Sequence, residues 1–177
     1  MVIPQELAMS VTPLKSQTSD RFEGIRPEDL SEYEKTTLVN LALAVLAPKY
    51  LSSDLIASPD TSRRYLQLSL AGCKNEVFGC FFLDNRHRLI AEEKMFFGTI
   101  DGASVHPRVV VQKSLELNAA AVILWHNHPS GVAEPSQSDQ QITHRLKDAL
   151  ALVDVRVLDH LVIGSEATTS FAERGLL

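Results

Sequence analysis

Two histidines and one aspartate have the residue types and the spacing of a metal site. His126 and His128 are two residues apart, where a short apolar run (residues 120–125) ends. Alternate residues of a strand point to the same face, so both imidazoles are expected on one side. Pro129 then favours a turn, and Asp139 falls in the first turn of the next predicted helix, where free amide groups favour a carboxylate.

Such a ligand set suits zinc. A catalytic zinc ion normally takes three protein ligands and leaves a fourth position for water, and the metal can bring the pKa of that water to about 7. Each residue alone has an ordinary explanation: a single histidine is more often a surface or packed residue, and Ser136 with Asp139 has the form of a helix capping box. Together the two histidines have no evident packing role, so the segment predicts one zinc ion per chain.

The spacing His126-x-His128, seven intervening residues, Ser136, two more residues and Asp139 matches the JAMM signature of JAB/MPN-domain metalloproteases. The segments GTIDGASVHPR, LNAAAVILWHNHPSG, PSQSD and VRVLDHLVIG resemble the RadC-like family, formerly described as DNA-repair proteins. The resemblance covers residues 55–177. It implies a mixed α/β (α+β) fold of the JAB/MPN, cytidine-deaminase-like type, a zinc ion held by the two histidines and the aspartate, and hydrolysis by metal-activated water.

The resemblance also implies a glutamate that moves a proton from the water to the leaving group. In JAB/MPN domains it begins an early strand in a Glu-Val-x-Gly pattern, and Glu76 to Gly79 match this pattern. Glu92 and Glu93, on the expected partner strand, remain alternatives, because one of them must face the same side. The hydroxyl of Ser136 has the family role of donating to the oxyanion of the tetrahedral intermediate, an interaction typically worth about 10²–10³ in rate.

Two residues near these segments have open interpretations. His160 lies in an otherwise apolar run and is either a hydrogen-bond partner for the metal site or a histidine packed in the core. Trp125 stands where the family usually has a small residue, so it either narrows the approach to the metal or fills the core.

The elements that must position these residues follow from periodicity and from turn residues. From residue 55 onward they predict a helix, a hairpin, a helix, a strand, a helix and a strand, hence a sheet packed by helices. Residues 1–54 are expected to be a tail and a helical extension, and residues 55–177 the JAB/MPN domain. The expected elements are a helix in the extension that ends before Pro48, a helix from about Pro59 to Gly72, a hairpin with its turn at residues 85–87, a helix from Pro107, a strand at 120–125, a helix from Ser136, a strand at 155–164, and a final edge segment at 170–177.

Composition narrows the range of partners. The 177 residues carry a net charge of −5, which does not support general nucleic-acid binding. A helix-hairpin-helix region, which longer relatives carry, is not recognisable in residues 1–54. No apolar run approaches the roughly 18 residues of a membrane span, and two cysteines fit thiols in a reducing cytoplasm. We therefore expect a cytoplasmic protein that acts on a peptide or protein substrate of unknown identity, without a membrane partner.

Three functions remain in competition at this point. The leading hypothesis is a zinc-dependent hydrolase, a metallopeptidase or isopeptidase-like amidase. The second keeps the metal but assigns an accessory role in DNA repair, recombination or mobile-element biology. The third is a non-catalytic binding module that the metal only stabilises. Neither the substrate, nor a need for a partner, nor the oligomeric state can be read from the sequence.

Overall fold

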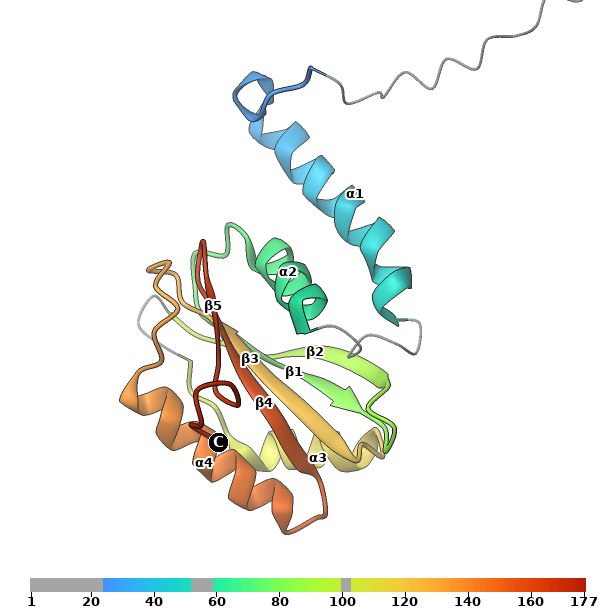
Figure 1. Cartoon of the computed structure of the whole chain (residues 1–177), viewed down its shortest axis with the longest axis vertical. Helices are drawn as coiled ribbons and strands as arrows, with labels where there is room; N and C mark the ends of the chain where they lie inside the picture. The colour runs from blue at the N-terminus through green and yellow to red at the C-terminus, as the bar shows by residue number, and fades with distance from the viewer. Residues whose placement is uncertain (1–23, 52–58, 100–102) are drawn as a thin grey trace, which may run out of the picture.

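The computed structural model describes residues 24–51, 59–99 and 103–177 (Figure 1). Its strands form one mixed sheet of five strands in the order β2-β1-β3-β4-β5, in which β3 and β4 are parallel and the other neighbours antiparallel. This architecture confirms the predicted mixed α/β class. The elements are a 3₁₀ helix at Pro27–Asp29, then α1 (Glu32–Leu51), α2 (Pro59–Leu70), β1 (Val77–Leu83), β2 (Leu89–Phe97), α3 (Pro107–Glu116), β3 (Ala121–Asn127), α4 (Gln137–Ala151), β4 (Arg156–Ile163) and β5 (Thr168–Ser170).

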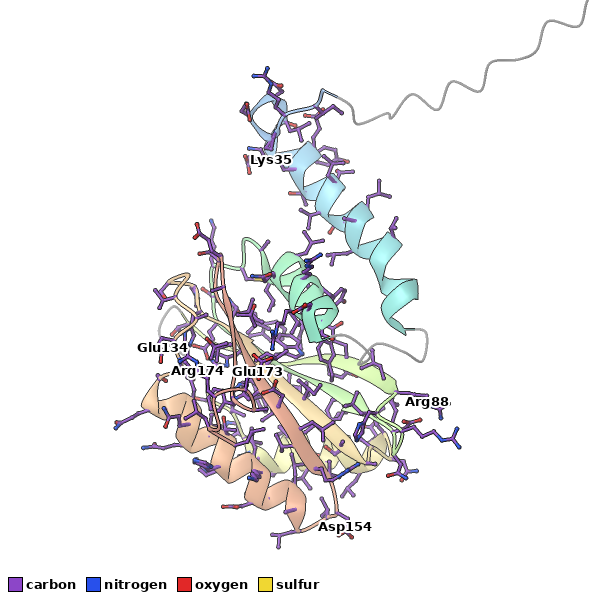
Figure 2. All side chains as sticks on the ribbon, viewed as in Figure 1. Lys35, Arg88, Glu134, Asp154, Glu173 and Arg174 are labelled. Atoms are coloured by element: carbon purple, nitrogen blue, oxygen red, sulfur yellow. The ribbon has the colours of Figure 1, made fainter. Side chains whose placement is uncertain are left out.

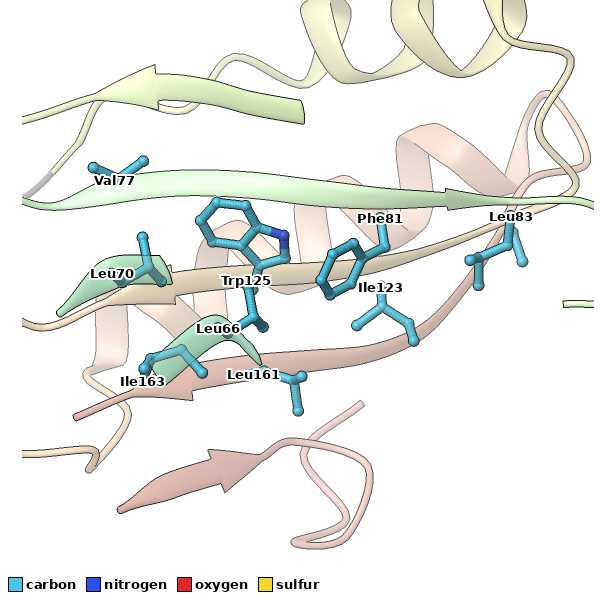
Figure 3. Close-up of a cluster of buried hydrophobic side chains, with 10 residues drawn as sticks. Leu66, Leu70, Val77, Phe81, Leu83, Ile123, Trp125, Leu161 and Ile163 are labelled. Carbon is cyan, nitrogen blue, oxygen red and sulfur yellow. The ribbon is translucent and has the colours of Figure 1, made fainter. Parts of the chain in front are cut away.

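Helices cover both faces of this sheet (Figure 1). Successive residues of β1 and β3 point to opposite faces, and both strands are buried throughout. On one face, Leu66 and Leu70 of α2 pack against Phe81 and Trp125 (Figure 3). Helices α3 and α4 cover the other face. The buried side chains there include Phe78, Cys80, Phe82, Val122 and Leu124 of the sheet, with Val110, Leu146 and Leu150 of the helices.

Trp125 belongs to the α2 face and is fully buried. It therefore fills the core and does not narrow the approach to the two histidines, which resolves one of the alternatives above. Its ring lies over Gly79 of the neighbouring strand, where an added Cβ would overlap ring atoms of the tryptophan and the backbone oxygen of Glu93. The glycine of the Glu-Val-x-Gly pattern is thus explained by the close approach of an indole ring.

Most of the predicted elements are confirmed, and two boundaries are wrong. Helix α1 continues through Pro48 to Leu51, because a proline removes one helical hydrogen bond but need not end a helix. The predicted edge segment 170–177 contributes only Ser170 to β5. Beyond it the chain folds back, since the Asp159 carboxylate accepts hydrogen bonds from Ser170 Oγ at 2.6 Å and from the backbone N–H of Ala172 at 2.9 Å.

The pairing of β3 with β4 contains a register shift. Val122 pairs with Val157, but the next residue, Ile123, pairs with Asp159, so β4 has one extra residue at this point. A shift of one residue moves every later side chain of that strand to the opposite face. In consequence His160 points to the face that α3 and α4 cover.

No helix in the part of the chain that the structure describes is both long and apolar enough to cross a bilayer.

Candidate metal centre

Three potential ligands come together from two elements. His126 is at the end of β3, His128 follows directly after the strand, and Asp139 is in the first turn of α4. The Nε2 atoms of the two imidazoles are 3.0 Å apart. His126 Nε2 lies 3.3 Å from Asp139 Oδ1, and His128 Nε2 lies 3.4 Å from Asp139 Oδ2. These three side chains form a group that could hold a metal ion.

The start of α4 fixes the carboxylate. Ser136 is the N-cap: its Oγ accepts a hydrogen bond from the backbone N–H of Asp139 at 3.1 Å, and its own N–H donates to Asp139 Oδ2 at 2.7 Å. This reciprocal capping box satisfies two otherwise free amides of the helix. It uses a lone pair of the serine hydroxyl, which keeps its hydrogen available for donation.

The charge of Asp139 depends on its two histidine neighbours. Burial alone would raise the pKa of this carboxyl, but its close contacts with the imidazoles of His126 and His128 outweigh that effect and hold its pKa well below the usual range. The same contact acts in the other direction on His128, whose pKa is raised chiefly by its hydrogen bond to Asp139. The imidazole of His128 is also held at its second nitrogen, because Nδ1 lies 2.7 Å from the carbonyl oxygen of Val132.

The segment between the histidines and α4 is attached to the C-terminal part of the domain. Both carboxylate oxygens of Glu134 lie 2.7 Å from Nη1 of Arg174, and the two residues are close together in Figure 2. The backbone N–H of Ser165 donates to Gly131 O at 3.0 Å. Gly131 has a positive φ of 83°, a conformation that favours glycine. These contacts set the course of the chain from the two histidines to Asp139.

The three candidate glutamates lie in different places. Glu92 accepts a hydrogen bond at 2.6 Å from the hydroxyl of Tyr65, which belongs to α2, so its carboxylate is on the face away from the imidazoles. Glu93 faces the α3 side, but its carboxylate lies 3.4 Å from Lys113 Nζ, in an ion pair with that helix. Neither Glu92 nor Glu93 lines the cavity in front of the histidines.

Glu76 lies beside the three potential ligands. Phe78 pairs with His126 across β1 and β3, and continuing this register by two residues puts Glu76 opposite His128. Its Oε1 accepts a hydrogen bond from the backbone N–H of Ala103 at 3.2 Å. Burial is the largest cause of a raised pKa at Glu76; the Asp139 carboxylate adds to the rise, and the imidazoles oppose it.

Asn127, between the two histidines, holds the backbone on either side of Glu76. Its Oδ1 accepts a hydrogen bond from the N–H of Val77 at 2.8 Å, and its Nδ2 donates to the carbonyl oxygen of Asn75 at 3.2 Å. The side chain is 5% exposed, so water does not readily replace these bonds. Asn127 thereby attaches the segment that carries the glutamate to the strand that carries the histidines.

His160 is in contact with a candidate ligand, as one of its two interpretations requires. His160 Nε2 lies 2.9 Å from His126 Nδ1, and its Nδ1 lies 2.6 Å from Oγ1 of Thr143 on α4. The ring is fully buried. Burial, and then the proximity of His126, lowers its pKa well below the ordinary value for histidine.

A cavity of about 770 Å³ lies in front of these groups. Its wall includes Glu76, His128, Ser136, Asp139 and, on the next turns of α4, the exposed Arg145. Of the candidate site residues, Glu76, His128, Ser136 and Asp139 therefore line one surface, and His126 is buried.

Three residues at or near the candidate metal centre, namely Asn127, Thr143 and Arg145, were not identified from the sequence. Asn127 carried a signal, since a buried strand holding a polar amide needs backbone partners for it. Thr143 also carried one, because it lies four residues after Asp139 and so on the same side of the helix. Arg145 had none: an exposed arginine on a helix is ordinary, and only the cavity distinguishes it.

Comparison with known proteins identifies the relatives of this chain. The sequence model of the RadC-like JAB domain matches residues 56–176. A UPF0758 protein of Thioalkalivibrio sulfidiphilus is 51% identical over 179 residues, covering 93% of this chain and 80% of its own length. One from Vibrio cholerae is 52% identical over 145 residues, covering 82% and 92%. One from Nitrosococcus oceani is 64% identical over 124 residues, and the match spans 70% of this chain but only 55% of that protein.

Proposed function

Because this chain belongs to the RadC-like JAB-domain family, we propose that it is a zinc-dependent hydrolase of amide bonds, with one zinc ion per chain. The reaction class is that of a metallopeptidase or isopeptidase, acting on a peptide or protein substrate. The observation that carries this proposal is a half-buried glutamate, Glu76, on the same cavity wall as a group of two imidazoles and one carboxylate.

The spacing of the donor atoms fits zinc. Ligand atoms about 2.0–2.1 Å from a tetrahedral zinc ion lie about 3.3 Å from one another. The two Nε2 atoms lie 3.0 Å apart, His126 Nε2 lies 3.3 Å from one oxygen of the Asp139 carboxylate (Oδ1), and His128 Nε2 lies 3.4 Å from the other (Oδ2). Two imidazoles and one carboxylate are also a donor set of catalytic rather than structural zinc sites, which are usually closed by a fourth protein ligand.

When bound, the metal ion would polarise a carbonyl group and lower the pKa of water. Glu76 would accept a proton from the attacking water and deliver it to the leaving nitrogen, and its raised pKa suits a group that must first take up and then release a proton. The hydroxyl of Ser136, whose hydrogen the helix cap does not use, would donate to the developing oxyanion.

The test separates metal binding from chemistry. Purified protein is expected to contain about one zinc per chain and to cleave members of a peptide library. Glu76→Gln should keep the zinc and lose cleavage, whereas Asp139→Asn should lose both. Glu92→Gln, on the opposite face, is the matched control and should cleave as the wild type does. Cleavage that persists in Glu76→Gln would contradict the assigned role of this glutamate, and wild-type protein that binds no zinc would contradict the proposal itself.

A further inference from the structure

A chain of three hydrogen bonds joins the side chain of one candidate ligand to the backbone of another. His126 Nδ1 lies 2.9 Å from His160 Nε2, and His160 Nδ1 lies 2.6 Å from Thr143 Oγ1. Thr143 Oγ1 in turn donates to the carbonyl oxygen of Asp139 at 2.5 Å. His126 is 1% exposed, and Thr143 and His160 are fully buried. Solvent therefore cannot readily supply other partners, and each group must be satisfied within the chain of bonds.

The donor and the acceptor of each bond follow from the number of hydrogens that each group can donate. A carbonyl oxygen only accepts, so the single hydroxyl hydrogen of Thr143 is directed to Asp139, and the hydroxyl oxygen accepts from His160 Nδ1–H. A neutral imidazole has one N–H, so His160 Nε2 is an acceptor for the Nδ1–H of His126. His126 Nε2, the atom that faces the Asp139 carboxylate, is left with its lone pair free.

We propose that Thr143 and His160 are positioning residues that fix His126 in the tautomer a metal ion requires. This inference rests on the proposed function, since it concerns the same centre. A ligating histidine commonly donates its other N–H to a carboxylate, a backbone carbonyl or water. Here the acceptor is a second histidine, which is hydrogen-bonded through Thr143 to the helix that carries Asp139. The Thr143 hydroxyl thus acts on two ligands, through the tautomer of His126 and through the carbonyl of Asp139.

The first test measures zinc affinity. Thr143→Val is nearly isosteric and removes the hydroxyl, whereas Thr143→Ser keeps it. With folding verified by circular dichroism, competition against a chromogenic chelator should show zinc bound about 10–100-fold more weakly by Thr143→Val, and close to wild-type affinity for Thr143→Ser. Ser114→Ala is the matched control: the buried Ser114 hydroxyl also donates to the carbonyl four residues earlier, at 2.8 Å, but on α3, so this variant should bind zinc normally. Equal affinity of Thr143→Val and Thr143→Ser would overturn the inference.

The second test reads the tautomer directly in metal-free protein. Imidazole ¹⁵N shifts, recorded at a pH where the rings are neutral, should show His126 protonated on Nδ1 in the wild type and a loss of this preference in Thr143→Val. A wild-type His126 protonated on Nε2 would overturn the inference. This measurement needs no metal, so failure of the wild type to bind zinc, which would contradict the proposed function, remains distinguishable from failure of the hydrogen-bond chain.

Discussion

The side-chain carbonyl of Asn127 accepts a hydrogen bond from the backbone N–H of Val77 at 2.8 Å. With the second bond of the same amide, to the carbonyl oxygen of Asn75, it fixes the backbone on both sides of Glu76. The residue between the two histidines therefore determines where the glutamate stands relative to them.

We predict that Asn127→Ala lowers the unfolding free energy by about 1–3 kcal/mol, because a buried backbone N–H loses its partner. Cleavage should fall by about 10–100-fold, since a shift of about 1 Å in a reacting group costs up to about 10²-fold, while zinc content stays near one per chain. Urea denaturation, metal analysis and peptide cleavage measure the three quantities. Asn85→Ala, in the hairpin turn, is the control. A loss of zinc with unchanged stability would argue that Asn127 acts on the metal ligands instead.

The pKa of Glu76 predicts a pH-dependent effect on stability. Burial raises this pKa in the folded protein above the unfolded value of about 4.3, so the folded state binds the proton more tightly. The ionised carboxylate then destabilises the fold at pH values above the folded pKa, and this penalty is absent below the unfolded pKa. In chelator-treated protein, Glu76→Gln should therefore gain stability relative to the wild type as the pH rises from about 4 to 7.5. Urea denaturation at both pH values measures the change, and a stability difference independent of pH would refute it.

Removal of the metal is predicted to destabilise the fold. An ion that binds only the folded state at 100 times its Kd adds about 2.7 kcal/mol to the unfolding free energy. Zinc addition to chelator-treated wild type should raise the melting temperature, and the rise should vanish in His126→Ala and Asp139→Asn. The control is His144→Ala, which removes an exposed histidine of α4 that is not one of the three candidate metal ligands. Thermal unfolding with and without zinc measures the effect, and an equal rise in all four proteins would point to binding elsewhere.

The contact of Gly79 with Trp125 predicts a specific pair of variants. Gly79→Ala places a methyl group against the indole ring and the backbone of β2, so we expect a loss of about 1–3 kcal/mol or more in unfolding free energy. In a Trp125→Leu background, Gly79→Ala should lower the unfolding free energy by less than it does in the wild type, because the ring is then absent. Denaturation of the two single variants and the double variant gives the coupling energy. Strict additivity of the two losses would mean that the clash with the β2 backbone, not with the indole, dominates.

Much of the fold, and the proximity of two histidines and one aspartate, was predictable because the sequence signals for them are local. The strand that ends at two histidines, the proline at the first position of α3 and the capping box of α4 each depend on a few neighbouring residues. The choice among Glu76, Glu92 and Glu93 was not local. For Glu92 it depended on which residues of β2 face α2, and for Glu93 it depended on the ion pair with Lys113 of α3. Strand register, which places both residues, is determined by tertiary packing.

The orientation of His160 could not be predicted from the local sequence either. If β4 paired with β3 without the register shift after Val157, regular alternation would turn His160 to the α2 face, away from His126. Nothing in the local sequence announces such a bulge. The helix extending through Pro48 is a further case, in which the sequence pattern overstated the effect of one residue.

Asp139 and Thr143 lie one helical turn apart in α4, and this spacing restricts insertions and deletions between them. Each added residue in a helix rotates everything beyond it by about 100°. An insertion or deletion of one residue between positions 139 and 143 would rotate the threonine hydroxyl to another side of α4 and leave the aspartate in place. We therefore expect length variation among homologous sequences to avoid this helical turn.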